Sequence, residues 1–360
     1  MIKVAILTRS DYRSPRILAE SLKSQIKKAG HDADIFFNID TLTRLKKFSD
    51  TNKSVKYHFW LRKKYLNLIK DFIFLRKLIK YYAIIISECS PNGFWRDLYH
   101  IEKFKGIIKK SVLYHEVYYL GNAPTQIENL EKKGDQTIER YDFHLAVSDV
   151  TEIKSKPDKK WSCVGLALHD LKLSPTPKNE FIALLDFSQP DFEEFANVQK
   201  KVLDELGIKT ICLSGKYTFD QIRSIYKKSA VYFMQSYEAF GLPIAECLAC
   251  GVQIFTPNSG WPMAWRLDEK PEVHGPGILP TCFTVYDGEH DLRKKLFLFK
   301  QAYNLQMTPK IIFENFTLNY PHLYYGNQKE IIKAIENLSA STRILKSLVI
   351  NKNNLILIYI

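Results

Sequence analysis

Two glutamates, Glu238 and Glu246, stand eight positions apart around a Phe-Gly-Leu-Pro turn, and their types and spacing suit ligand chemistry. The apolar run 230–234 precedes the turn and predicts a buried strand. Pro243 occupies an early helical position and Gly251 a helix end, so we expect a short helix between them. The free N–H groups at the start of such a helix favour an anion such as a phosphate.

The two carboxylates suit the groups that surround a phosphate rather than the phosphate itself. One lies in the loop and the other in the first turn of the expected helix, so both are near the anion site. A carboxylate accepts strong hydrogen bonds, and the hydroxyls beside a phosphate belong to a ribose or a sugar. The motif therefore predicts a sugar-nucleotide site. An ordinary strand–turn–helix unit with two solvated glutamates is the alternative.

The elements that must position these glutamates form two alternating series. In the first half, a helix opens at Ser14-Pro15 and ends at Gly30, and strands are expected at 2–8, 33–37, 82–87, 111–115 and 143–147. In the second half, helices near 192–206 and 220–228 alternate with strands at 181–185, 210–213, 230–234 and 252–256. Such alternation predicts parallel sheets with helices on both faces. Ligands bind at the carboxyl ends of their strands, so two facing domains make a cleft.

The length of 360 residues favours two domains rather than one. We expect a first domain over 1–165, a second over 166–320, and a C-terminal helix and tail over 321–360 that crosses back to the first domain. The first apolar run is too short for a signal peptide, and no apolar run is long enough to span a membrane. The six scattered cysteines suit a reduced compartment, so a cytoplasmic location is predicted.

The net charge of +13 is concentrated in the first domain. Residues 1–165 carry 31 Lys and Arg against 19 Asp and Glu, whereas the remainder carries 21 against 20. Within 53–80, nine Lys and Arg face a single acid and apolar residues interleave, which predicts basic amphipathic helices. Either this basic face is solvated, or it adsorbs to an anionic membrane surface at about 1 kcal/mol per cation. No nucleic-acid-binding module or zinc-finger spacing is present.

The Glu-x7-Glu spacing, with Phe-Gly-Leu-Pro inside it and Ala-Cys-Gly after it, resembles the signature of retaining GT-B glycosyltransferases. These enzymes build bacterial polysaccharides and glycolipids. Weaker matches follow in the family's order at 29–32, 114–116, 147–148 and 164–170. The resemblance implies a GT-B fold, in which two doubly wound Rossmann-like α/β domains face a cleft. It further implies sugar transfer from a UDP or GDP type donor to a carbohydrate or lipid-linked acceptor, with no metal or other cofactor.

The resemblance also implies roles for individual residues. Glu238 would contact the donor sugar, and Glu246 the ribose of the nucleotide. His115 would donate a hydrogen bond near the reacting carbon. Backbone N–H groups would hold the diphosphate, aided by the helix dipole. The backbone and loop residues expected in the donor site are Phe240, Gly241, Leu242, Ser236 and Gly260.

One departure from the family concerns the cations that grip the diphosphate. The family usually places an Arg and a Lys after the first strand of its second domain, but here residues 185–191 contain two acids and no base. Lys216, or Arg9, Arg13 and Arg16 of the first loop, would have to replace them. The loss keeps a second interpretation open, namely a catalytically weak or inactive GT-B protein that binds a glycan or scaffolds a synthesis complex.

Overall fold

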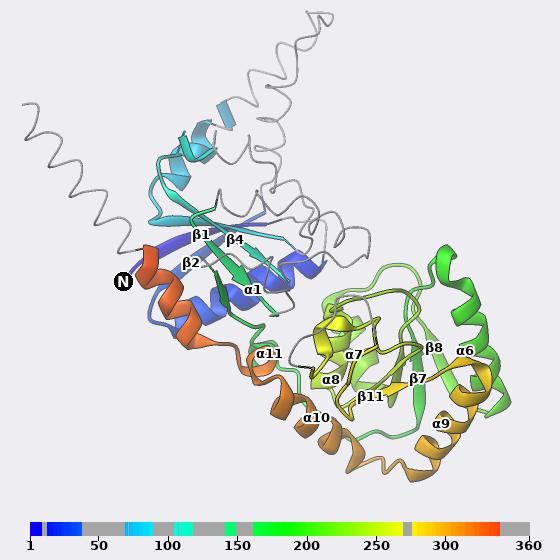
Figure 1. Cartoon of the computed structure of the whole chain (residues 1–360). Coiled ribbons are helices and arrows are strands. Elements are labelled where there is room, and N and C mark those ends of the chain that lie inside the picture. Colours follow the sequence, from blue (N-terminus) through cyan, green and yellow to red (C-terminus); the bar gives the residue numbers. More distant parts are fainter. Residues whose placement is uncertain are drawn as a thin grey trace, which may run out of the picture.

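The structure is a computed structural model, and it describes residues 1–8, 13–37, 69–70, 72–88, 104–106, 108–117, 141–148, 161–268 and 276–338. These residues form two parallel α/β domains (Figure 1). Parts of four predictions lie outside the described residues. They concern Arg9, the side chain of Arg13, residues 53–68 and 71 of the basic segment, and residues 339–360 of the C-terminal tail.

The first sheet has six parallel strands in the order β2-β1-β3-β4-β5-β6. Their bounds are β1 (Lys3–Leu7), β2 (Asp32–Phe36), β3 (Ala83–Ser87), β4 (Ser111–Glu116), β5 (Phe143–Ala146) and β6 (Trp161–Cys163). Successive side chains of a strand point to opposite sides of the sheet, and helices cover both sides. Val4 and Ile6 pack with helix α1 (Arg13–Lys28), whereas Ala5 and Leu7 pack with the helix at 72–78.

The start of α1 differs slightly from the prediction. The helix begins at Arg13, so Ser14 is its second residue rather than the cap that was expected. Pro15 is the third residue, within the first turn, where a missing N–H leaves no helical hydrogen bond unmade. Gly30 follows the helix with a φ of +82°, as expected for a glycine that ends a helix.

The second sheet has five parallel strands in the order β11-β10-β9-β7-β8. Its strands are β7 (Ile182–Leu185), β8 (Lys209–Cys212), β9 (Val231–Phe233), β10 (Gln253–Thr256) and β11 (Phe283–Val285). Its helices are α6 (Glu193–Glu205), α7 (Phe219–Lys228), α8 (Leu242–Ala249) and α9 (Gly288–Ala302). The strand order changes direction between β7 and β9, and this is the point where doubly wound sheets bind ligands.

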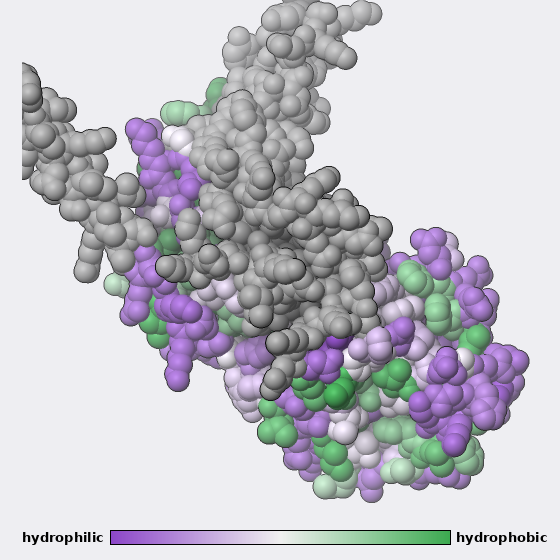
Figure 2. All heavy atoms as spheres, viewed as in Figure 1, coloured by the Kyte–Doolittle hydropathy of each residue, from purple (hydrophilic) through white to green (hydrophobic). Residues whose placement is uncertain are grey.

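The helices of the second domain cover opposite faces of its sheet. Helices α7 and α8 pack on one face, and α6 and α9 pack on the other. Two ion pairs link the outer surfaces of α6 and α9, Glu205 with Arg293 and Lys201 with Glu289. Hydrophilic side chains accordingly gather over this end of the domain (Figure 2).

The chain passes between the domains twice. The first passage lies between β6 and β7, an interval that contains the predicted boundary at residue 165. On the return, α10 (Thr308–Asn319) and α11 (Pro321–Tyr325) lead to a helix at 328–338 that lies against the first domain (Figure 1). Its residues Ile331, Ala334, Ile335 and Leu338 join the hydrophobic cluster of β1 and α1.

The two passages touch at Gly165, where a Cβ would lie 1.9 Å from the backbone oxygen of His322. With a φ of +71° as well, this position requires glycine.

The domains also share one hydrophobic cluster. Ile17 of α1 and Val117 and Val147, which follow β4 and β5, belong to the same cluster as Tyr232 and Phe240 of the second domain. Among the described residues, no helix is long and apolar enough to cross a membrane.

Candidate functional site

The glutamate motif lies at the carboxyl edge of the second sheet, next to the point where the strand order reverses. Strand β9 ends at Phe233, the loop carries Glu238, and α8 carries Glu246 in its second turn. The neighbouring strand β7 ends one residue before Asp186, whose N–H donates to the carbonyl of Phe233 at 3.3 Å. The predicted order of strand, loop and short helix is therefore present at the edge where such folds bind ligands.

Buried aromatic residues hold the motif turn. The indole Nε1 of Trp265 donates to the carbonyl of Phe240 at 2.6 Å, and the two rings stack with centroids 5.3 Å apart. The N–H of Ala264 donates to the carbonyl of Ala239 at 2.9 Å. Gly241 has a φ of +65°, and a Cβ there would lie 2.7 Å from Cγ of Glu238. Only glycine fits the turn that brings the first glutamate back to the start of the helix.

The start of α8 offers a small set of backbone donors. The N–H of Gly241 points at Glu238 itself and lies 3.2 Å from its Oε1. Ala245 donates to the carbonyl of Gly241, and Pro243 has no N–H. Helix geometry leaves the N–H groups of Leu242 and Ile244 without a partner inside the helix. These two groups are therefore the donors best able to meet an anion.

Glu246 is buried and forms an ion pair with Arg223 of α7. Arg223 was not among the residues predicted from the sequence. The Nε of Arg223 lies 3.1 Å from Oε1 of Glu246, and the side chains are 18% and 4% exposed. Burial raises the pKa of Glu246 above its usual range, and the charge and hydrogen bond of Arg223 offset only part of this shift. A cation from the neighbouring helix α7 thus lies beside the second motif glutamate.

Arg16, one of the first-loop candidates, lies at the junction of the domains. Its Nε donates to Glu20 at 2.8 Å, and its guanidinium lies 5.6 Å from the ring centre of Phe219 in α7. The guanidinium of Arg223 lies 5.5 Å from the centre of the same ring. The two arginines, one from each domain, therefore both contact Phe219.

His115 is fully buried near the carboxyl end of β4. Its Nδ1 lies 2.9 Å from the hydroxyl of Ser87, and Nε2 has no hydrogen-bond partner in the described part of the chain. Burial, reinforced by nearby His144, lowers the pKa of His115 to about 3, so the imidazole is neutral at physiological pH. A second buried pair lies alongside, with His144 Nε2 2.9 Å from Oε1 of Glu116.

The remaining predicted residues take different positions. Ser236 is buried directly after β9, and the N–H of Gly260 donates to Asn258 Oδ1 at 2.7 Å. Lys216 is exposed in the loop after β8 and forms no ion pair with any residue that the structure describes. Trp261 packs between Phe192 and Phe195, at centroid distances of 5.4 and 5.0 Å. These aromatic rings rim the carboxyl edge of the second sheet.

Asp186 occupies the region where the family usually has a base. Burial raises the pKa of this carboxyl above its usual range, and hydrogen bonds from Tyr232 and the N–H of Phe187 offset only part of this shift. Across the described ranges, no group of three or more His, Cys, Asp or Glu could hold a metal ion. Cys247 and Cys250 are buried, and burial raises the pKa of the Cys250 thiol to about 12, which disfavours the thiolate that binds metals.

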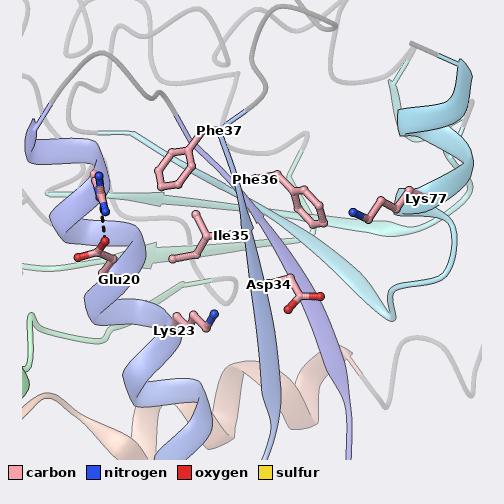
Figure 3. A pocket seen from close by; sticks show the side chains of 8 residues that line it. Glu20, Lys23, Asp34, Ile35, Phe36, Phe37 and Lys77 are labelled. Carbon is pink, nitrogen blue, oxygen red and sulfur yellow. Dashed lines mark hydrogen bonds and ion pairs between the residues drawn. The ribbon is translucent and has the colours of Figure 1, made fainter. Parts of the chain in front are cut away.

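A cavity of about 520 Å³ lies on the first domain, between α1 and the edge strand β2 (Figure 3). Its lining residues are Arg16, Glu20, Lys23, Asp34, Ile35, Phe36, Phe37 and Lys77. The Nζ of Lys77 lies 4.9 Å from the ring centre of Phe36, and Arg16 lies 5.5 Å from that of Phe37. Cations and aromatic rings thus share one concave surface, and Arg16 connects it with the domain junction.

No protein-family model matches the sequence, and no curated protein matches it either. Solved structures match over nearly the whole chain. HepE from Anabaena, solved in complex with UDP and glucose, has a TM-score of 0.51 at 12% identity and covers 95% of this chain and 100% of its own. MnaA from S. aureus, solved with UDP, has a TM-score of 0.52 at 10% identity and covers 95% and 97%. The fold is GT-B.

A third match gives the same fold. A protein described as a putative UDP-N-acetylglucosamine 2-epimerase from Listeria monocytogenes has a TM-score of 0.52 at 10% identity, covering 95% of this chain and 97% of its own. At such identities the likeness concerns the architecture of two parallel-sheet domains. The predicted fold class is confirmed.

Proposed function

We propose that this chain is a retaining, metal-independent glycosyltransferase that moves a sugar from a nucleotide-sugar donor to a carbohydrate or lipid-linked acceptor, in the synthesis of a cell-surface polysaccharide or glycolipid. One observation carries the proposal. Glu238 and Glu246 flank the start of α8 at the carboxyl edge of a doubly wound sheet, beside the reversal of strand order. Hydroxyl acceptors on either side of backbone N–H donors match a sugar, a diphosphate and a ribose. UDP is the favoured nucleotide, since proteins of this fold have been solved with it.

The residues would divide the work as follows. Glu246, held by Arg223, accepts hydrogen bonds from the ribose, and Glu238 accepts them from the donor sugar. The N–H groups of Leu242 and Ile244 stabilise the negative charge that develops on the departing diphosphate. His115 is neutral and buried, so its role is to donate or accept a hydrogen bond rather than to supply charge.

The reaction needs no protein nucleophile. The bond between the anomeric carbon and the diphosphate oxygen breaks while the acceptor oxygen bonds to the same face of the sugar. The departing phosphate oxygen takes the acceptor's proton. The protein's contribution is therefore to hold the donor and stabilise its leaving group with fixed dipoles.

A panel of UDP, GDP, ADP and CDP in a thermal-shift assay tests the donor site, because a ligand that binds the native state raises its stability. One nucleotide should raise the melting temperature clearly, and Glu246→Ala should remove that shift. The anomeric configuration of the product, followed by proton NMR, tests retention. A product of inverted configuration contradicts the retaining mechanism while leaving sugar transfer in place.

A second candidate is a sugar-nucleotide epimerase. It is favoured by the match to a protein described as such an enzyme, at a TM-score equal to or above that of HepE. The same NMR experiment separates the two functions. A transferase releases the nucleoside diphosphate only when an acceptor is present, whereas an epimerase changes the sugar signals of UDP-N-acetylglucosamine without an acceptor.

A third candidate is a GT-B protein that binds a glycan or scaffolds a synthesis complex without turnover. Asp186 favours it, because a half-buried acid stands where the retaining GT-B glycosyltransferases that the motif resembles usually have a base. Glycan binding in an array, combined with no shift by any nucleotide, would support this function against the transferase.

Membrane adsorption at the cytoplasmic face is a further part of the proposal. The helix at 72–78 leaves Phe72 and Ile73 66% and 60% exposed, and Arg76, Lys77 and Lys80 are exposed around them. Apolar side chains ringed by cations suit an anionic bilayer surface. The double change Phe72→Ser and Ile73→Ser should abolish flotation with anionic liposomes, whereas Ile311→Ser on α10 should not. Binding to neither anionic nor neutral liposomes would remove the membrane claim.

A further inference from the structure

Arg223 forms an ion pair with Glu246, and the proposed function gives a role to only one of its N–H groups. Its Nε is engaged by Glu246 Oε1 at 3.1 Å. A guanidinium has four further N–H groups, and within the described ranges Glu246 is the only carboxylate with which Arg223 forms an ion pair. The side chain keeps 18% of its surface exposed, so these donors can meet a ligand.

The position of this guanidinium matches the layout of α8. Leu242, at the start of the helix, lies four residues before Glu246 and therefore on the same face. About one helical turn separates them, roughly 6 Å along the axis. A phosphate at the start of α8 and a ribose at Glu246 are thus one turn apart, and these two groups are adjacent in a nucleotide.

Phe219 restricts where the guanidinium can go. The centre of its ring lies 5.5 Å from the guanidinium of Arg223 and 5.6 Å from that of Arg16. Arg16 pairs with Glu20 of its own helix in the first domain, whereas Arg223 pairs with a glutamate of the motif itself. Arg223 combines a carboxylate, an aromatic ring and a part-exposed fork of N–H donors, which is an arrangement suited to a phosphate.

Resting on the proposed function, we propose that Arg223 is a donor-binding residue with two tasks. Its Nε holds the carboxylate of Glu246 in place for the ribose, and its terminal N–H groups bind the adjoining phosphate of a nucleoside diphosphate. Arg223 thereby replaces the base that is missing after β7, where Asp186 stands. The sequence candidates for this task were Lys216 and the arginines of the first loop.

The test compares a nucleoside with its diphosphate. Calorimetry measures the affinity of the full chain and its variants for uridine and for UDP. Arg223→Met should weaken UDP binding about tenfold more than uridine binding, because only UDP carries the phosphate that the guanidinium meets. Arg223→Lys should restore part of the preference, since it keeps the charge without the fork. Glu246→Gln should weaken both ligands alike and leave their ratio unchanged.

Arg293→Met serves as the matched control, because Arg293 also forms ion pairs in the second domain but lies on α9. It should leave both affinities unchanged. Thermal melts establish that each variant folds, and Arg223→Lys carries the comparison if Arg223→Met does not. Equal weakening of uridine and UDP by Arg223→Met, or no weakening, overturns the phosphate assignment while the proposed function stands. A wild-type chain that binds none of UDP, GDP, ADP and CDP overturns both.

Discussion

Glu246 and His115 are buried at the carboxyl edges of the second and the first sheet, and they are held in opposite ways. In the second domain, Glu246 is buried with Arg223 as its partner, and Glu238 accepts from the N–H of Gly241. In the first domain, His115 is buried against the hydroxyl of Ser87, with no cation or carboxylate paired to it in the described residues. Arg223 compensates the charge of Glu246, whereas His115 stays neutral.

This difference follows from the cost of burying charge. A carboxylate can stay ionised when buried if a guanidinium lies within hydrogen-bond distance, whereas an unpaired imidazole loses its proton instead. The second edge therefore suits a ligand that offers both hydroxyls and an anion. The first suits a neutral hydroxyl. The two edges share one hydrophobic cluster, so a donor and an acceptor could be held by environments of different polarity.

The largest effect is expected from removing the anchor of the second edge. Trp265 is fully buried and both stacks on Phe240 and donates to its carbonyl. Trp265→Ala should lower the free energy of unfolding by about 4 kcal/mol. It should also lower the nucleotide affinity of the molecules that remain folded, because the motif turn loses its contacts with Trp265. Tyr114→Ala, which removes a buried aromatic from the first edge, should cost similar stability without changing nucleotide affinity. Chemical denaturation and calorimetry measure the two quantities. Equal loss of affinity in both variants would contradict a local anchor.

The second prediction concerns the neutral histidine of the first edge. Folding lowers the pKa of His115 from 6.5 to about 3, so at intermediate pH the unfolded chain binds more protons than the native one. The free energy of unfolding should therefore fall as the pH falls below 6.5, by about 3 kcal/mol down to about pH 4.5. His115→Asn keeps a partner for Ser87 and should remove this part of the pH dependence. His290→Asn, on the exposed surface of α9, should not. Identical curves for wild type and His115→Asn would show that His115 is not the titrating group.

The sequence predicted the sheets well, because most strands are continuous apolar runs. Predicted and observed bounds agree within about two residues from β1 to β5 and from β7 to β10. Strands β6 and β11 were missed, since each is short and a polar residue, Ser162 or Thr284, interrupts its apolar run. The glutamate motif was placed on the right loop and helix because its turn and helix signals are local.

The charge balance of the site could not be predicted in the same way. Arg223 and Glu246 are 23 positions apart in the chain, and only the packing of α7 against α8 brings them together. Nothing in the local sequence of α7 distinguishes Arg223 from a solvated helix residue. Likewise, His115 could be placed at a strand end, but its neutral state depends on burial by distant segments. The ion pair of Glu246 and the neutral state of His115 both depend on contacts between distant segments, which local sequence patterns do not reveal.

A third prediction tests a further compensated charge in the second domain. The ammonium of Lys178 is buried and donates to the carbonyls of Lys227 and Cys250, at the C-terminal ends of α7 and α8. Burial lowers its pKa from 10.5 to about 8, so above pH 8 the native state loses this proton before the unfolded chain does. The free energy of unfolding of wild type should rise relative to Lys178→Met, by about 2 kcal/mol up to about pH 9.5.

Subtracting the Lys178→Met curve removes the titration of the other groups that the two proteins share. Lys227→Met provides the control, because only its backbone carbonyl contacts Lys178. A constant difference between wild type and Lys178→Met across this range would show that the ammonium is not destabilised by burial. The charge would then be solvated, unlike that of Glu246.

The smallest effect is expected at Lys216, the exposed lysine once expected to replace the missing base. It lies after β8, the strand at the sheet edge beyond β7, whereas the motif follows β9 on the other side of β7. Lys216→Ala should leave the free energy of unfolding unchanged and cost about 0.5 kcal/mol of UDP affinity, as exposed charges do. Calorimetry of Lys216→Ala and Arg223→Met under the same conditions compares how much UDP affinity each cation contributes. A larger loss for Lys216→Ala would move the phosphate toward the outer edge of the sheet, away from the compensated carboxylate of Glu246.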